Sequence, residues 1–207
     1  MENARNMLSL PDRLTLEPGK VIGLVGPPGF GLTRVGMSML ADSSRTGPVV
    51  YLDVRGWVNP LTAWEAGIPP ERLIIVRCFD RLLWPKATAA LLEGIRAVYA
   101  EVPPGVRESV LRRLAALARS RRSALLLHPL SGDLPAGVAY VRYQGREVAW
   151  EGPDAGHGRL TGRRLVLEAS GKGMSGIERV IEVEDDGADV VRMVSRLAAA
   201  PAGRAAG

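Results

Sequence analysis

Short apolar runs recur along the first two thirds of the chain, and segments with helical spacing of apolar residues separate them. Each run is bounded by glycine, proline or polar residues, which is typical of strands buried on both faces of a parallel sheet. The runs predict strands at 21–25, 49–53, 73–77, 97–102 and 123–129. The segments between them predict helices at 33–40, 61–66, 82–96 and 106–120. This alternation predicts an α/β fold in which helices flank a mostly parallel sheet.

Beyond residue 130 the pattern changes to β-strands alone, expected at 138–143, 148–150, 164–168 and 177–184. Such strands suit an antiparallel β extension at the C-terminal end of the parallel sheet. A glycine-rich loop is expected over 152–162, another turn or loop at 170–173, and a last short helix at 188–197. We predict a single domain over 1–197 with a lead-in at 1–16, and a disordered Ala, Gly and Pro tail at 198–207.

The first predicted strand and helix are joined by a loop that follows part of the phosphate-loop pattern G-x-x-x-x-G-K-[ST]. Its glycines are Gly26 and Gly31, with Gly29 between them, and its hydroxyl is Thr33. In a working loop the backbone N–H groups hold phosphates, the lysine reaches the outer phosphates and the hydroxyl ligates magnesium. Leu32 stands in the place of the lysine. Loss of that charge-assisted hydrogen bond weakens phosphate binding by about one to two orders of magnitude.

Two interpretations of the loop stay open. In the first, its glycines serve only a tight connection between strand and helix, and no cofactor is expected. In the second, residual binding of ATP and magnesium persists, although Arg34 is a poor substitute for the lysine because the next helical side chain points about 100° away. Asp53 and Glu101 would then be the acids that organise magnesium, since the carboxyl ends of parallel strands face the binding crevice. A strand-capping role explains either acid equally well.

Basic residues exceed acidic residues by 27 to 22, which gives a net charge of +5 and a pI near 9.9. Only three of the basic residues are lysine, and 24 are arginine. The densest basic cluster lies on and just beyond the helix predicted at 106–120, and comprises Arg112, Arg113, Arg119, Arg121 and Arg122.

Arg112 and Arg119 share one helix face, so contact with a DNA backbone is one interpretation of the cluster. An exposed helix face and the arginine-rich composition of a GC-rich genome explain it equally well. The aromatic fraction of 5% disfavours a surface on which bases stack.

The sequence gives little support for a disulfide, a metal site or a membrane segment. The single Cys78 excludes an intrachain disulfide, and His128 and His157 have no metal-ligand spacing, so no metal site is predicted. The sequence has no signal peptide and no apolar run long enough to span a membrane. We therefore expect a cytoplasmic protein without membrane contact.

The order of the predicted elements resembles the ATPase core of the RecA recombinase family, from about Leu8 to Glu184. The stretches that carry the resemblance are 16–22, 50–53, 60–68, 72–77, 138–143 and 163–172. The resemblance implies a RecA-like P-loop NTPase core in which three functional positions have changed. Leu32 replaces the loop lysine, Arg55 replaces the catalytic glutamate two residues beyond Asp53, and His128-Pro129-Leu130 replaces the phosphate-sensing glutamine after the fifth strand.

A RecA-like core without these residues is similar to the ImuA group, accessory proteins of bacterial mutagenic repair. The resemblance implies a protein that does not hydrolyse ATP and that acts in damage-induced (SOS) translesion synthesis. The implied partners are a Y-family polymerase homologue and an error-prone replicative-type polymerase, with single-stranded DNA or RecA as further candidates and self-association through residues 1–16. Two alternatives stay open: a divergent DNA-stimulated ATPase that uses Thr33 and Arg34, and a nucleic-acid-binding protein that uses the arginine cluster.

Overall fold

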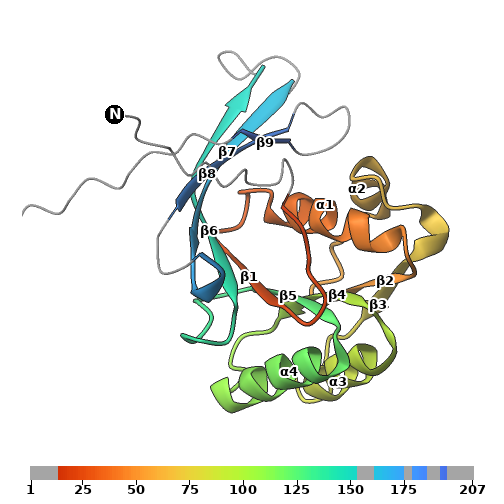
Figure 1. The fold of residues 1–207 in the computed structure, drawn as a ribbon. Helices are drawn as coiled ribbons and strands as arrows, with labels where there is room; N and C mark the ends of the chain where they lie inside the picture. Colours follow the sequence, from red (N-terminus) through yellow and green to blue (C-terminus); the bar gives the residue numbers. More distant parts are fainter. Residues whose placement is uncertain (1–13, 153–160, 175–178, 186–191, 195–207) are drawn as a thin grey trace, which may run out of the picture.

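The protein is organised around one continuous sheet. In the computed structural model, which describes residues 14–152, 161–174, 179–185 and 192–194, the strands lie in the order β3-β2-β4-β5-β1-β6-β7-β8-β9 (Figure 1). Neighbouring strands are parallel from β3 to β6 and antiparallel from β6 to β9. The predicted α/β fold with an antiparallel β extension is therefore confirmed.

All five apolar runs of the first part of the chain are strands. They are β1 (Val21–Val25), β2 (Val49–Asp53), β3 (Leu73–Arg77), β4 (Ala97–Val102) and β5 (Ala124–Pro129). Every residue of β1, β2, β4 and β5 is buried, whereas β3 forms an edge of the sheet and is only half-buried. The continuous apolar runs reflect a sheet whose two faces are both covered by helices.

The helices cover the two faces in pairs. Helices α1 (Leu32–Ser44) and α2 (Pro60–Glu65) lie on one face, and α3 (Trp84–Gly94) and α4 (Glu108–Arg121) lie on the other (Figure 1). A 3-10 turn, η1 (Pro70–Arg72), leads into β3. The core is divided accordingly: Met37 of α1 belongs to one buried apolar cluster, and Leu114 of α4 belongs to the other. This packing on both sides holds the strand ends in place.

Strand β6 (Val141–Glu151) pairs in parallel with β1 and joins the two parts of the sheet. The sequence predicts two separate strands here, at 138–143 and 148–150. This prediction is wrong, because the single strand β6 continues from 141 to 151. The glycine between them, Gly145, does not make a turn but lies at a bulge, where the register with the next strand shifts between Gly145 and Glu147.

The antiparallel part continues with β7 (Gly162–Ser170), β8 (Arg179–Asp185) and β9 (Arg192–Val194). The helix predicted at 188–197 is wrong over 192–194, which pair with β8 instead. An open strand edge offers backbone partners that outweigh a weak local preference for helix. The rest of that segment, most of the 152–162 loop, the lead-in up to residue 13 and the tail at 198–207 lie outside the described residues.

Candidate functional site

The glycine-rich loop connects β1 to α1, as its pattern predicts. Gly29 and Gly31 have φ values of +89° and +68°, a conformation that glycine adopts without strain. The carbonyl of Gly31 accepts the backbone N–H groups of Arg34 (3.0 Å) and Val35 (3.3 Å), and so begins the helix. Pro27 and Pro28 carry no N–H group, so the first part of the loop has few donors for an anion.

The side chain of Leu32 is part of the core, with only 3% of its surface exposed. One of its methyl groups lies 2.8 Å from where a Cβ on Gly26 would be, and the other lies 3.7 Å from where a Cβ on Gly145 of β6 would be. The isobutyl group therefore packs between the loop and β6. Apolar packing has replaced the lysine that the phosphate-loop pattern requires at this position.

A cavity of about 300 Å³ opens beside the loop, at the carboxyl ends of β1, β2 and β5. It is lined by Gly26, Pro27, Pro28, Gly29, Gly31, Leu32, Thr33, Arg55, Trp57, His128, Pro129 and Leu130. The cavity brings together the three positions that the RecA resemblance singles out: Leu32, Arg55 and the 128–130 segment. Asp53, Glu101 and Arg34, three of the predicted nucleotide-binding residues, are not among the residues that line it.

Glu101 is bound to Arg55 and to the backbone that follows β2. Its carboxylate accepts the Tyr51 hydroxyl at 2.8 Å, the Val54 N–H at 2.9 Å, the Arg55 N–H at 3.2 Å and the Arg55 Nε–H at 3.0 Å. Arg55 also donates through Nη2. The Glu101 side chain is only 1% exposed, and its two carboxylate oxygens accept all five of these hydrogen bonds. A magnesium ion would need the same oxygens as ligands. Glu101 therefore positions Arg55 at the cavity.

Glu101 stays ionised in this setting. Burial alone raises the pKa of a carboxyl group, but hydrogen bonds from Arg55, from the Val54 N–H and from Tyr51 together lower the pKa of Glu101 below its ordinary value. Burial also opposes the charge of Arg55, yet its bonds to Glu101 raise the pKa of the guanidinium. The guanidinium lies 5.1 Å from the ring centre of Trp57, so the cavity wall combines a fixed cation and an exposed indole.

Asp53 has a structural role. Its side chain is fully buried and accepts the backbone N–H groups of Gly56 (2.7 Å) and Val58 (3.3 Å). These bonds fix the turn after β2, which leads to Arg55 and Trp57. Of the two interpretations of this acid, the structure favours the one in which it caps its strand.

His128 ends β5 beside the cavity and is 8% exposed. Its Nδ1 lies 2.6 Å from the hydroxyl oxygen of Tyr99, which is itself fully buried. Burial lowers the pKa of His128 to about 4; Glu101 opposes this shift and Arg55 adds to it. The imidazole is therefore neutral at pH 7 and offers no positive charge to a phosphate.

Two arginines lie near the loop without lining the cavity. Arg34 forms an ion pair with Glu65 of α2, at 2.5 Å, which turns it away from the role of a substitute lysine. Arg163 of β7 reaches the loop from the antiparallel part: a Cβ on Gly31 would fall 1.2 Å from its Nη1. Nothing in the local sequence around Arg163 indicates this contact, because it depends on how β7 lies beside β6.

A family model, MT3502 N-terminal domain, matches residues 10–135, which is more than half of the chain. The chain belongs to the MT3502 N-terminal domain family. The match covers the loop, the cavity and every element from β1 to β5, and it ends before β6. No curated protein matches the sequence.

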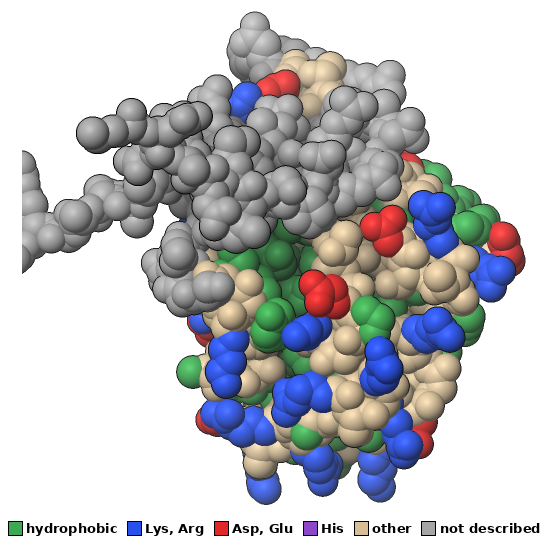
Figure 2. All heavy atoms as spheres, viewed as in Figure 1, with side chains coloured by type: hydrophobic (Ala, Val, Ile, Leu, Met, Phe, Trp, Pro, Cys, Tyr) green, Lys and Arg blue, Asp and Glu red, His purple; other side chains and the backbone are tan. Residues whose placement is uncertain are grey.

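In this member of the MT3502 N-terminal domain family, the predicted DNA-binding arginines do not form one surface of the same kind: some are paired with glutamates, one is exposed, and two line a cavity. Arg112 pairs with Glu108 and donates to the Ala136 carbonyl at 3.0 Å, and Arg121 pairs with Glu93. Arg113 is exposed, and Arg119 and Arg122 line a second cavity at the other end of β1. In Figure 2, which has the same view as Figure 1, Lys and Arg side chains lie over the lower part of the molecule, where Figure 1 shows α3 and α4.

Within the part of the chain that the structure describes, no three His, Cys, Asp or Glu side chains form a group that could hold a metal ion. No helix in that part is long and apolar enough to cross a membrane.

Proposed function

We propose that this protein is a RecA-like core that does not hydrolyse ATP and that acts by binding macromolecular partners. The observation that carries the proposal is the cavity beside the loop, in which Leu32, Arg55 and the 128–130 segment stand where a RecA-type ATPase has its lysine, glutamate and glutamine. These three positions come from distant parts of the chain, so their convergence supports the resemblance as well as the loss of activity.

The chemistry of the cavity supports the same conclusion. Among the residues that line it, none is a carboxylate that could activate water or hold magnesium. The charge that develops during phosphoryl transfer must be neutralised by cations in the right place, and the lysine position is apolar and buried. The neutral His128 supplies no positive charge, and Arg55 is held by Glu101, so neither acts as a mobile cation.

Large exposed apolar side chains favour a role in protein binding. Six of them follow β2 and β3: Trp57, Leu61, Trp64, Phe79, Leu82 and Leu83. The two strands are parallel neighbours, with Asp53 opposite Arg77, so these connections begin side by side. Large apolar side chains exposed on neighbouring segments are typical of interaction surfaces. By the resemblance to the ImuA group, we propose that the partner is a Y-family polymerase homologue, in damage-induced translesion synthesis.

The experiment that tests the loss of nucleotide function is a calorimetric titration of magnesium-ATP into the protein, with phosphate release measured in parallel with and without single-stranded DNA. We expect no binding heat and no release above that of a heat-inactivated control, because the lysine and the metal-binding acid are both missing. A Leu32→Lys variant, checked for folding by thermal unfolding, restores the charge at one position.

Micromolar binding by the unmodified protein, together with DNA-stimulated phosphate release that Thr33→Ala abolishes, would contradict the proposal and favour a divergent ATPase. Binding only in Leu32→Lys would support it, since the loop backbone would then be intact and only its charge lost.

A further inference from the structure

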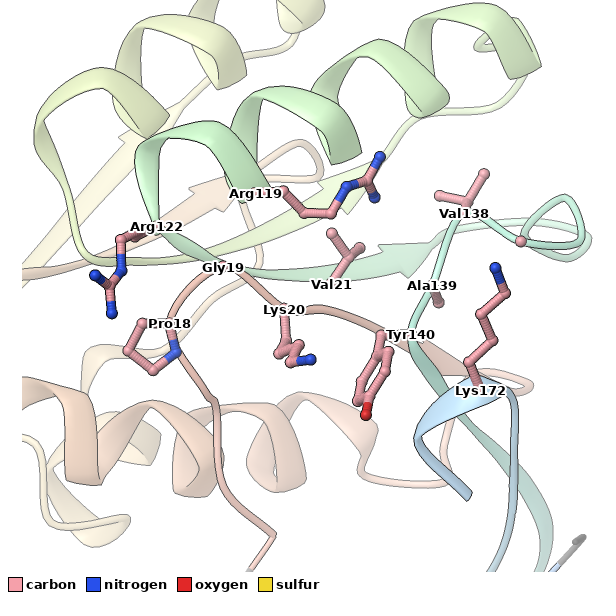
Figure 3. Close-up of a pocket in the computed structure, with 11 residues that line it drawn as sticks. Pro18, Gly19, Lys20, Val21, Arg119, Arg122, Val138, Ala139, Tyr140 and Lys172 are labelled. Carbon is pink, nitrogen blue, oxygen red and sulfur yellow. The ribbon is translucent and has the colours of Figure 1, made fainter. Parts of the chain in front are cut away.

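A second cavity, of about 440 Å³, lies at the end of β1 opposite to the loop (Figure 3). Four segments build it: the turn before β1, the C-terminal end of α4, the segment that precedes β6, and a 3-10 turn, η2 (Lys172–Met174), that follows β7. Its residues are distant in the sequence, and the fold alone brings them together.

The cavity is strongly basic. Lys20, Arg119, Arg122 and Lys172 line it, and no acidic residue does. Within the described residues, none of these four cations forms a salt bridge with a carboxylate, whereas Arg112 and Arg121 of the same helix α4 are paired with Glu108 and Glu93. Like charges that line one cavity repel one another, and a bound anion would relieve that repulsion.

The distribution of lysine sets this cavity apart from the rest of the basic surface. The chain has 24 arginines and three lysines, and two of the three, Lys20 and Lys172, line this cavity. A compact ammonium group fits a confined space that a planar guanidinium would fill, and it binds phosphate as a point charge. Composition bias toward arginine therefore does not account for this site.

The backbone places Lys172 at the cavity. A Cβ on Gly171 would fall 2.6 Å from the carbonyl oxygen of Tyr140, and the Gly173 N–H donates to that same oxygen at 3.0 Å. Two glycines thus let the turn lie directly against the start of β6. In Figure 3, the side chains of Arg119 and Lys172 extend toward Val138, the side chain of Lys20 lies beside Tyr140 on the other side of the chain trace, and Arg122 lies beside Pro18.

The aromatic side chain of the cavity, Tyr140, is in contact with one of the cations. The Lys20 Nζ lies over the ring of Tyr140, 3.8 Å from its centre, and a Cβ on Gly173 would fall 2.6 Å from Cε1 of the same ring. The ring holds the Lys20 ammonium group by a cation–π contact, and the side chain keeps 36% of its surface exposed. The charge of the cavity favours an anionic ligand.

We propose that this cavity binds a compact, multiply charged phosphate group. Cations that line one cavity suit a compact anion, whereas a nucleic-acid backbone is matched by cations spaced along a surface. The chemistry fits the polyphosphate chain of a small ligand and also the phosphorylated 5′ end of a nucleic-acid strand. The proposal does not depend on the loop cavity, which lies at the other end of β1.

The test is a calorimetric titration of inorganic tripolyphosphate, without magnesium, into the full chain and three variants. Arg119→Gln and Lys172→Gln each remove one cation of the cavity, and we expect each to weaken binding about tenfold or more. Arg113→Gln is the matched control, because it makes the same change of charge at an exposed position of α4 outside the cavity. We expect it to alter the affinity less than about twofold, since exposed charges at a distance are screened.

A second titration, with 5′-phosphorylated and 5′-hydroxyl oligonucleotides of one sequence, distinguishes the sources of the phosphate. Preference for the phosphorylated strand, lost in Lys172→Gln, identifies a strand end, and binding of tripolyphosphate alone identifies a small ligand. The proposal is overturned if tripolyphosphate does not bind, if Arg113→Gln weakens its binding as much as Arg119→Gln, or if Thr33→Ala in the loop abolishes it.

Discussion

At the scale of single residues, Glu101 and His128 lie opposite each other on β4 and β5 and respond to acid in different pH ranges. Burial lowers the pKa of His128 from 6.5 to about 4, so the unfolded chain takes up a proton first as the pH falls. This group therefore removes up to about 3 kcal/mol of stability between pH 6.5 and pH 4. The pKa of Glu101 is lowered in the folded protein, so the ionised carboxylate contributes to the stability of the fold. This contribution is lost at more acidic pH, as the pH falls below about 4.5. We expect His128→Asn to flatten the dependence of unfolding free energy on pH only in the upper range, measured by urea denaturation from pH 7 to pH 4. Parallel curves for the two proteins would show that His128 is not buried as a neutral group.

At the scale of elements, the loop between β1 and α1 is contacted by Arg163 of β7, a strand two places away from β1 in the sheet. Gly29 and Gly31 both have positive φ, so alanine is strained to a similar degree at either position. They differ in their surroundings: a Cβ on Gly29 meets nothing within 4 Å, whereas a Cβ on Gly31 would collide with Arg163. We expect Gly31→Ala to lower the free energy of unfolding by up to about 1 kcal/mol more than Gly29→Ala, because the guanidinium at the end of the flexible Arg163 side chain must move aside. Adding Arg163→Ala should recover part of this difference. Equal losses for the two glycine variants, measured by urea denaturation, would contradict the contact between the loop and β7.

At the scale of the whole molecule, apolar side chains form two core clusters and also an exposed group beyond β2 and β3. Leu82 is 77% exposed before α3, and Leu92 within α3 is 1% exposed. We expect Leu92→Ala to cost about 2–5 kcal/mol of stability, because it leaves a cavity in the core. Leu82→Ala should change stability by less than about 0.5 kcal/mol. If the exposed group binds the polymerase partner, Leu82→Ser and Trp57→Ser will each weaken that binding about tenfold while leaving thermal unfolding unchanged. Unaltered affinity in a titration with the Y-family polymerase homologue would exclude this surface as the partner site.

Periodicity and turn residues predict most of the fold because both are local properties of the chain. The five apolar runs became β1 to β5, and the loop between β1 and α1 begins and ends where its glycines predict. Local patterns failed where pairing at a distance decided the structure. The sequence predicts separate strands at 138–143 and 148–150, but β7 pairs with β6 on both sides of a bulge at Gly145, so one strand spans the interval. Residues 192–194 are a strand because β8 offers them an edge.

The sequence by itself determined that this is an α/β protein whose first loop follows part of the phosphate-loop pattern without its lysine, because the residue type at position 32 is visible without a structure. Only the tertiary structure decided what the remaining charged side chains do. It bound Glu101 to Arg55, placed Arg163 against Gly31, and brought Lys20, Arg119 and Lys172 to one cavity. The physical reason is that an ionic contact depends on a few ångströms between atoms, and those distances follow from strand order and register across the whole sheet.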